Sequence, residues 1–200
     1  LSTQTSAGML FETDLRLRPN GDAGLLAVSV DAFRDYQLGQ AWVWEHQALT
    51  RARFVAGDIA VGERFEAIRE EILRQRRDPA KLKEEVLAMR RRMLDAHASK
   101  SAAFVDLKQD PGGIIDVEFI VQYLILAHAH AHPELTRNLG NIALLGMAAE
   151  LGLIPAGLAE PVRDAYREYR RMQHAARLDG RSTARIERAA VAPRIDAVLT

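Results

Sequence analysis

An acid and two arginines alternate with leucines near the start of the chain. Asp14, Arg16 and Arg18 are separated by Leu15 and Leu17. On a β-strand, this period of two places the carboxylate and both guanidinium groups on one face. A carboxylate can bind one side of a divalent cation, and arginines can neutralise phosphate oxygens. The pattern indicates a phosphate-binding face. The alternative is an exposed acid paired with a neighbouring arginine, which would contribute little stability.

The upstream sequence does not complete such a site. In a nucleotide site, magnesium usually needs a second carboxylate or a phosphate ligand. Glu12 is the only acid that precedes Asp14, and no glycine-rich phosphate loop stands before it. We therefore expect the chain to be a fragment that carries one part of an active site.

The segment 108–118 is a second candidate site. Gly112 and Gly113 precede a predicted helix, where glycine lets the backbone approach a ligand and free N–H groups can bind an anion. Simple capping is the alternative, with Asp110 as the N-cap and Asp116 offsetting the helix dipole.

Glu118 lies in the same predicted helix, which is otherwise apolar. A buried carboxylate needs a partner, and Arg51, Arg53 or Lys108 could supply it. We favour a structural salt bridge over contact with a nucleotide.

The remaining clusters favour structural roles. Trp42 and Trp44 are expected to pack in the core, with base stacking as the minor alternative. The basic runs 90–92 and 170–171 are predicted to be solvated faces.

A histidine tract has metal-like spacing. His128 and His132 are four residues apart, with His130 between them, but no acid shares their helical face and Pro133 ends the helix. Histidines at a helix C-terminus are the better interpretation.

The predicted elements that position these residues are mostly helical. Strands are expected only over Met9–Leu17 and Leu25–Val28, joined by a turn-rich connection. From Ser29 onward the period is helical, with Ser29 or Asp31 as the first N-cap. Further helices are expected over 42–49, 58–74, 114–130, 141–151, 158–178 and 189–199. Another is expected where Leu82, Val86, Met89 and Met93 form an apolar stripe. The fold class is α+β, mostly α, with domains at 1–28 and 29–200.

Composition limits the possible partners. The 200 residues contain 27 basic and 27 acidic side chains, so no global field favours nucleic acid or an anionic membrane. The longest apolar stretch is broken by Gln122, and it is too short to span a bilayer. Cysteine is absent and the chain shows no signal peptide, which is consistent with a reducing compartment. We expect a cytoplasmic protein without nucleic-acid or membrane partners.

Three motifs carry a family resemblance. They are Asp-Leu-Arg-Leu-Arg-Pro-Asn-Gly at 14–21, Ala-Trp-Val-Trp-Glu-His-Gln-Ala-Leu at 41–49, and Asp-Leu-Lys-Gln-Asp-Pro-Gly-Gly-Ile-Ile-Asp-Val-Glu-Phe at 106–119. Together they resemble glutamine synthetase adenylyltransferase, also called glutamate-ammonia-ligase adenylyltransferase. The resemblance runs from Gly8 to about Leu178, and it is greater to the C-terminal, adenylylating half than to the other half. The glycine-serine loop and Asp-x-Asp pair that open the family's catalytic domain are absent.

The resemblance implies a multifunctional enzyme of nitrogen metabolism with two polymerase-beta-like nucleotidyltransferase halves. One half transfers AMP from ATP to a tyrosine of glutamine synthetase, and the other removes it by phosphorolysis. This chain would then carry part of one nucleotidyltransferase sheet, followed by a helical bundle domain. The implied cofactors are Mg²⁺ and ATP, and the implied partners are glutamine synthetase and the P-II signal protein.

The resemblance also assigns roles to residues. Asp14 is implied to be a catalytic carboxylate that binds metal, facing the absent Asp-x-Asp pair. Arg16, Arg18, Lys108, Gly112 and Gly113 are assigned to nucleotide binding, with simple turn packing as an alternative for Arg18.

Two other interpretations remain open. The chain could belong to the deadenylylating half, or to a related uridylyltransferase. It could also be a helical module without catalytic activity that docks glutamine synthetase or P-II. In each case we expect the fragment alone to be catalytically incomplete.

Overall fold

The computed structural model describes residues 3–6, 8–9, 18–19, 21–99 and 101–200. Contacts divide the chain into two compact units, Leu1–Ile72 and Leu73–Thr200. Helices dominate both, and short antiparallel strand pairs accompany them. The prediction of an α+β chain that is mostly α is confirmed. The domain boundary after residue 28 and the nucleotidyltransferase type of the sheet stay predictions.

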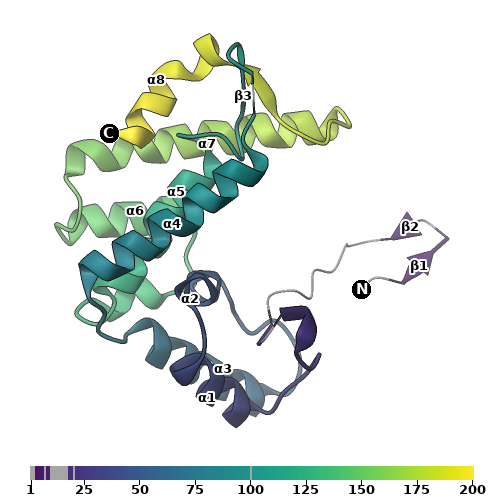
Figure 1. The fold of residues 1–200 in the computed structure, drawn as a ribbon, viewed down its shortest axis with the longest axis vertical. Helices are drawn as coiled ribbons and strands as arrows, with labels where there is room; N and C mark the ends of the chain where they lie inside the picture. The colour runs from purple at the N-terminus through teal and green to yellow at the C-terminus, as the bar shows by residue number, and fades with distance from the viewer. Residues whose placement is uncertain (1–2, 7, 10–17, 20, 100) are drawn as a thin grey trace. The chain divides into compact units, whose positions relative to one another are not determined.

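The first unit contains three α-helices among its described residues (Figure 1). Its elements are β1 (Gln4–Thr5), paired antiparallel with β2 (Gly8–Met9), a 3-10 turn η1 (Gly21–Ala23), α1 (Val30–Gly39), α2 (Val43–Leu49) and α3 (Ile59–Leu73).

The strand predicted over Leu25–Val28 is wrong. This stretch forms no strand, and Leu25 and Leu26 are exposed. The preceding turn closes as η1, and the chain then extends to Ser29, whose hydroxyl accepts the N–H of Ala32 at 3.1 Å and caps α1. The short stretch therefore leads into the helix cap. Most of the other predicted strand, Met9–Leu17, lies outside the described residues.

A buried arginine ties α3 to the end of α2. The Nε of Arg69 donates to the carbonyl of Leu49 at 3.0 Å, and its Nη2 donates to that of Thr50 at 2.7 Å. Carbonyls at a helix C-terminus lack partners within the helix, and here a guanidinium group supplies the donors. Burial is the main cause that lowers the pKa of Arg69, opposed by the nearby Glu66 and Glu70.

The second unit is a set of helices with one short strand pair. Its elements are α4 (Pro79–His97), β3 (Phe104–Asp106), α5 (Ile114–His128), a 3-10 helix η2 (Pro133–Thr136), α6 (Asn141–Glu150), α7 (Ala156–Leu178), β4 (Arg185–Glu187) and α8 (Arg188–Leu199).

Helix α5 forms the centre of this unit (Figure 1). It contacts α4, α6 and α7, and α7 in turn packs against α6 and α8. The side chains of Val117, Ile125 and Leu126 are almost fully buried. The apolar composition of α5 is therefore explained by helices that cover it on several sides, as the sequence predicted.

The β3–β4 pair was not predicted. Val105 pairs with Ile186, and Asp106 pairs with Arg185. Each strand has three residues, and most of the second unit lies between them in the sequence. Such short strands have too few residues to show a period of two, so only the tertiary structure reveals them.

A buried ion pair joins α4 to the start of α5. The Nε of Arg90 donates to a carboxylate oxygen of Asp116, and its Nη2 donates to the carbonyl of Gln109 at 2.9 Å. Arg90 is 5% exposed, whereas Arg91 and Arg92 are exposed. The prediction of a solvated face for 90–92 is therefore wrong for Arg90, because that side chain points into the helix interface.

None of the helices in the described part of the chain is long and apolar enough to cross a membrane.

Replacing Arg90 with methionine tests the buried ion pair. The change removes the charged donor from the partly buried carboxylate of Asp116, so we expect the free energy of unfolding to fall by about 3 kcal/mol or more. Urea denaturation measures it. Arg91→Met is the matched control because Arg91 is exposed, and it should change stability by less than about 0.5 kcal/mol. Equal losses in the two variants would contradict a special role for Arg90.

Candidate functional site

Most of the predicted catalytic strand lies outside the residues that the structure describes. Asp14 and Arg16 lie outside the described residues. Arg18 is described, and its Nε donates to the carbonyl of Gly24 at 3.4 Å, while its own carbonyl accepts the N–H of Gly21 at 2.8 Å. These are turn contacts, the alternative noted from sequence. The role of Arg18 in phosphate binding stays a prediction.

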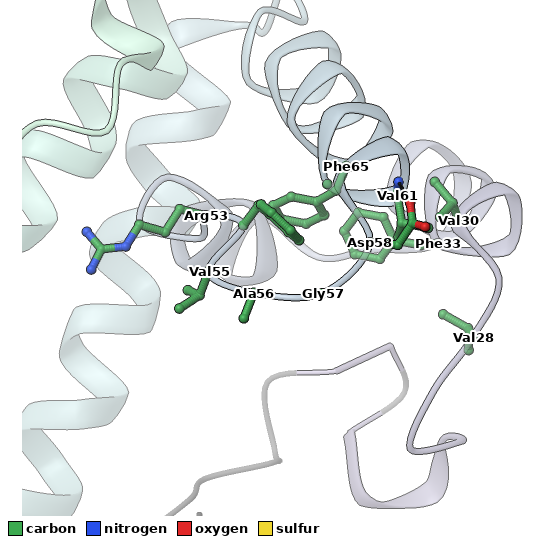
Figure 2. A pocket seen from close by; sticks show the side chains of 12 residues that line it. Val28, Val30, Phe33, Arg53, Val55, Ala56, Gly57, Asp58, Val61 and Phe65 are labelled. Atoms are coloured by element: carbon green, nitrogen blue, oxygen red, sulfur yellow. Dashed lines mark hydrogen bonds between the residues drawn. The ribbon is translucent and has the colours of Figure 1, made fainter.

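A cavity of about 520 Å³ in the first unit is lined mainly by apolar side chains (Figure 2). The rings of Phe33 and Phe65 lie with their centroids 5.7 Å apart. Arg53 and Asp58 are the charged residues of the lining, and the Asp58 carboxylate accepts the N–H of Val61 at the start of α3. An apolar lining of this kind does not suit a phosphate group.

The tryptophan motif forms the start of α2. The Glu45 carboxylate accepts the backbone N–H of Trp42 at 2.8 Å and the hydroxyl of Tyr36 at 2.9 Å. The ring of buried His46 contacts the Gln37 carbonyl at 3.0 Å. Trp42 is 69% exposed, so its predicted place in the core is wrong. Its backbone begins the helix, and its indole remains in solvent.

Two acids fold the loop between β3 and α5. The Asp110 carboxylate accepts the N–H of Ser99 at 2.6 Å and that of Asp106 at 2.8 Å. The Asp106 carboxylate accepts the N–H groups of Lys108 and Gln109 at 2.9 and 3.2 Å. Asp110 was proposed as the N-cap of α5, but Gly113 occupies that position. The carboxylate of Asp110 instead connects the loop to the residues that follow α4.

The N–H groups at the start of α5 have acceptors within the chain. Gly112 donates to Asp116 at 2.6 Å, and Gly113 donates to the Asp110 carbonyl at 3.1 Å. Ile114 and Ile115 donate to the carbonyls of the turn at 107 and 108. These N–H groups are therefore bonded within the chain, with Asp116 near the helix start as the capping alternative expected but without Asp110 as the N-cap. Nucleotide binding by the two glycines stays a prediction.

Close packing explains why glycine stands at both positions. Gly112 has φ +77°, and a Cβ added to it would lie 2.7 Å from the side chain of Ile195 in α8. A Cβ on Gly113 would lie 2.5 Å from the Leu107 carbonyl oxygen. What approaches these glycines in the structure is the chain itself.

Lys108 is exposed and lines a polar cavity of about 310 Å³ in the second unit. Three arginines share this lining: Arg177 at the end of α7, Arg181 in the following loop, and Arg185 in β4. Sequence reasoning missed these three residues. Nothing in their spacing relates them to Lys108, because the β3–β4 pair and the end of α7 bring the segments together.

Glu118 is partly buried and lies near α7. Its Oε1 accepts the hydroxyl of Tyr166 at 3.4 Å, and the Tyr166 oxygen accepts Nδ2 of Asn141 at 2.9 Å. This polar chain joins α5, α6 and α7. The predicted structural role fits these contacts, and Tyr166 is a partner that the sequence analysis did not name.

The described residues hold no group of three or more histidine, aspartate, glutamate or cysteine side chains that could bind a metal ion. The histidine tract begins where α5 ends, at His128, as its interpretation as a helix end predicts. The described part also does not fit a complete magnesium site, so a site that uses Asp14 would need further ligands.

His128, where α5 ends, is partly buried. Burial is the main cause that lowers the pKa of His128, and the charges of His132 and His130 act in the same direction. A base whose pKa is lower in the folded state stabilises the fold above its unfolded pKa of about 6.5, and it loses that contribution as the pH falls.

The pH dependence of stability tests the state of His128. We expect the melting temperature to decrease between pH 7.5 and 5.5, and to decrease less in His128→Gln, which cannot take up this proton. Thermal melts at several pH values measure the difference. Identical slopes for the two proteins would contradict a buried neutral imidazole.

The variant Gly113→Ala tests the packing role of the glycines. The added methyl group would meet backbone oxygen, so we expect the free energy of unfolding to fall by about 2–3 kcal/mol. The control is Gly157→Ala, where a Cβ meets nothing within 4 Å and a small gain is expected in α7. Urea denaturation measures both. Unchanged stability of Gly113→Ala with lost nucleotide binding would instead support a ligand role.

Comparison with known proteins adds family information to this geometry. Residues 1–68 match the family model of glutamate-ammonia ligase adenylyltransferase, and residues 80–192 match that of GlnD PII-uridylyltransferase. The chain is 66% identical over 180 residues to a protein of Aromatoleum aromaticum. The matched segment is 90% of this chain and 19% of that protein. It is 62% identical over 187 residues to a protein of Chromobacterium violaceum, covering 94% and 21%.

Both relatives are named bifunctional glutamine synthetase adenylyltransferase/adenylyl-removing enzyme. A protein of Nitrosomonas europaea with the same name is 62% identical over 90% of the chain. The chain spans about a fifth of the length of these relatives. The chain therefore belongs to the glutamine synthetase adenylyltransferase family.

Proposed function

We propose that the chain is part of an enzyme that transfers AMP from ATP to a tyrosine of glutamine synthetase. The observation that carries the proposal is the 66% identity, over 90% of the chain, to a relative named for this activity. The alternation of Asp14, Arg16 and Arg18 supports it, because an acid beside two arginines suits a transferring phosphate.

In the proposed reaction these residues bind the metal and the phosphates of ATP. The tyrosine oxygen attacks the α-phosphorus of ATP, the bond to the β-phosphate breaks, and pyrophosphate leaves while the phenolic proton passes to solvent. Asp14 would offer one carboxylate to the magnesium that accompanies ATP, and Arg16 and Arg18 would neutralise phosphate oxygens. Because the other ligands must come from beyond this chain, the fragment is proposed to be inactive alone.

The partners and location are proposed on the same basis. The names of the relatives support glutamine synthetase as the target. The match of 80–192 to a PII-uridylyltransferase model supports the P-II signal protein as a second partner. Equal numbers of basic and acidic residues favour neither nucleic acid nor a membrane surface, and the absence of cysteine suits the cytoplasm.

Removal of AMP by phosphorolysis is the second candidate function. It is favoured by the relatives' names, which contain both activities. An assay of a protein extended at its N-terminus distinguishes the two activities. If the chain belongs to the adenylylating enzyme, the extended protein should add AMP to unmodified glutamine synthetase in the presence of ATP. If it belongs to the AMP-removing enzyme, the extended protein should release ADP from adenylylated glutamine synthetase in the presence of phosphate.

The substitution Asp14→Asn in the extended protein tests the proposed site. It preserves shape and removes charge, so AMP transfer should fall by orders of magnitude. The melting temperature should stay the same or rise slightly, because repulsion among neighbouring acids is relieved. Incorporation of labelled AMP into glutamine synthetase measures the rate.

Asp31→Asn is the matched control. Asp31 is exposed on α1 and pairs with Arg64 at the surface, so its neutralisation should leave the rate unchanged. An Asp14→Asn enzyme that works near the parent rate would contradict the proposal. Tight magnesium-dependent binding of ATP by these 200 residues alone would contradict it too.

A further inference from the structure

We propose that the polar cavity of the second unit is a binding site for a small phosphate-bearing polyanion of the pyrophosphate class. The cavity is formed where α4 ends, where the turn after β3 begins, and where α7 leads through a loop into β4. All of its lining residues belong to one compact unit.

Charge is the first argument. Lys108, Arg177, Arg181 and Arg185 line the cavity together with a single carboxylate, that of Asp106. His97 apart, these charged side chains give the lining an excess of three positive charges. Like charges around one concave surface repel each other, and a bound anion relieves that repulsion.

The cations are available to a ligand. Within the described part of the chain, none of the four basic side chains forms an ion pair or a side-chain hydrogen bond. This distinguishes them from three other arginines of α7, because Arg163, Arg167 and Arg171 each form an ion pair with the acid three residues earlier. The one acid of the lining is occupied, because Asp106 accepts two backbone N–H groups.

Polar groups without charge complete the lining. Ser182 and Thr183 contribute hydroxyl groups, and Oε1 of Gln109 is buried without a hydrogen-bond partner among the described residues. The two hydroxyl groups can donate hydrogen bonds to phosphate oxygens.

The lining also selects the chemical class. Apart from the imidazole of His97 it contains no aromatic ring, and its only apolar residues are Ala176 and Ala184, so it offers little surface on which a nucleobase could stack. Three arginines and a lysine match the three to four negative charges of pyrophosphate or tripolyphosphate, and guanidinium groups bind such oxygens in pairs. The inference is independent of the proposed adenylyl transfer, because Asp14 takes no part in it.

Calorimetric titration of the 200-residue chain with pyrophosphate tests this proposal. We expect saturable binding of one equivalent. Arg181→Gln and Lys108→Gln should each weaken binding about tenfold or more, with unchanged melting temperatures, because both side chains are exposed. The matched control is Arg171→Gln, an exposed arginine of α7 outside the cavity that is paired with Glu168, and it should change affinity by less than about twofold.

Three further titrations separate this site from a nucleotide site. Magnesium should weaken pyrophosphate binding, because it neutralises the ligand and the cavity has no spare carboxylate to hold the metal. ATP should bind no more tightly than tripolyphosphate, and citrate should bind more weakly than pyrophosphate. The proposal is overturned if pyrophosphate does not bind, or if Arg171→Gln loses as much affinity for pyrophosphate as Arg181→Gln and Lys108→Gln do. It is also overturned if citrate binds as tightly as pyrophosphate, or if binding requires magnesium.

Discussion

The second unit depends on the ion pair between Arg90 and Asp116. A guanidinium group that is almost fully buried must satisfy its donors within the protein, because desolvation without partners is costly. The Nε and Nη2 of Arg90 do so with Asp116 and with the carbonyls of Gln109 and Asp110, whereas its buried Nη1 has no hydrogen-bond partner among the described residues. One side chain of α4 thereby fixes the first turn of α5 and the loop before it. Asp116 also accepts the N–H of Gly112, so one carboxylate binds both the Arg90 guanidinium group and the backbone before α5.

This constraint determines what the glycine pair and the adjacent lysine can do. The N–H groups at the start of α5 are directed to acceptors within the chain, and the space beside the glycines is filled by Leu107 and Ile195. Lys108 belongs to the same turn, but its side chain is exposed and lines the basic cavity. The described contacts of this motif are thus packing contacts, while Lys108 of the same turn lines the cavity with the three arginines.

Buried arginines serve the two units in a similar way. In the first unit Arg69 donates to carbonyls at the end of α2. In the second, Arg77 donates to carbonyls of Leu73 and Gln75, and burial lowers the pKa of Arg77 to about 10. In both places a long cationic side chain supplies hydrogen-bond donors to backbone oxygens at helix ends. Such arginines act structurally, in contrast to the exposed cations of the cavity.

The sequence by itself determined the helices and the family. Periodicity and caps predicted the presence of α1 to α8, and the bounds of all but α1 and α4 to within a few residues, because apolar stripes and residues such as Ser29 are local signals. Motifs of consecutive residues identified the family for the same reason. The tertiary structure alone decided that Arg90 is buried while Arg91 is exposed, that β3 pairs with β4, and that Lys108 shares a cavity with three arginines. These features join residues far apart in the chain, and no local pattern encodes which distant side chains meet.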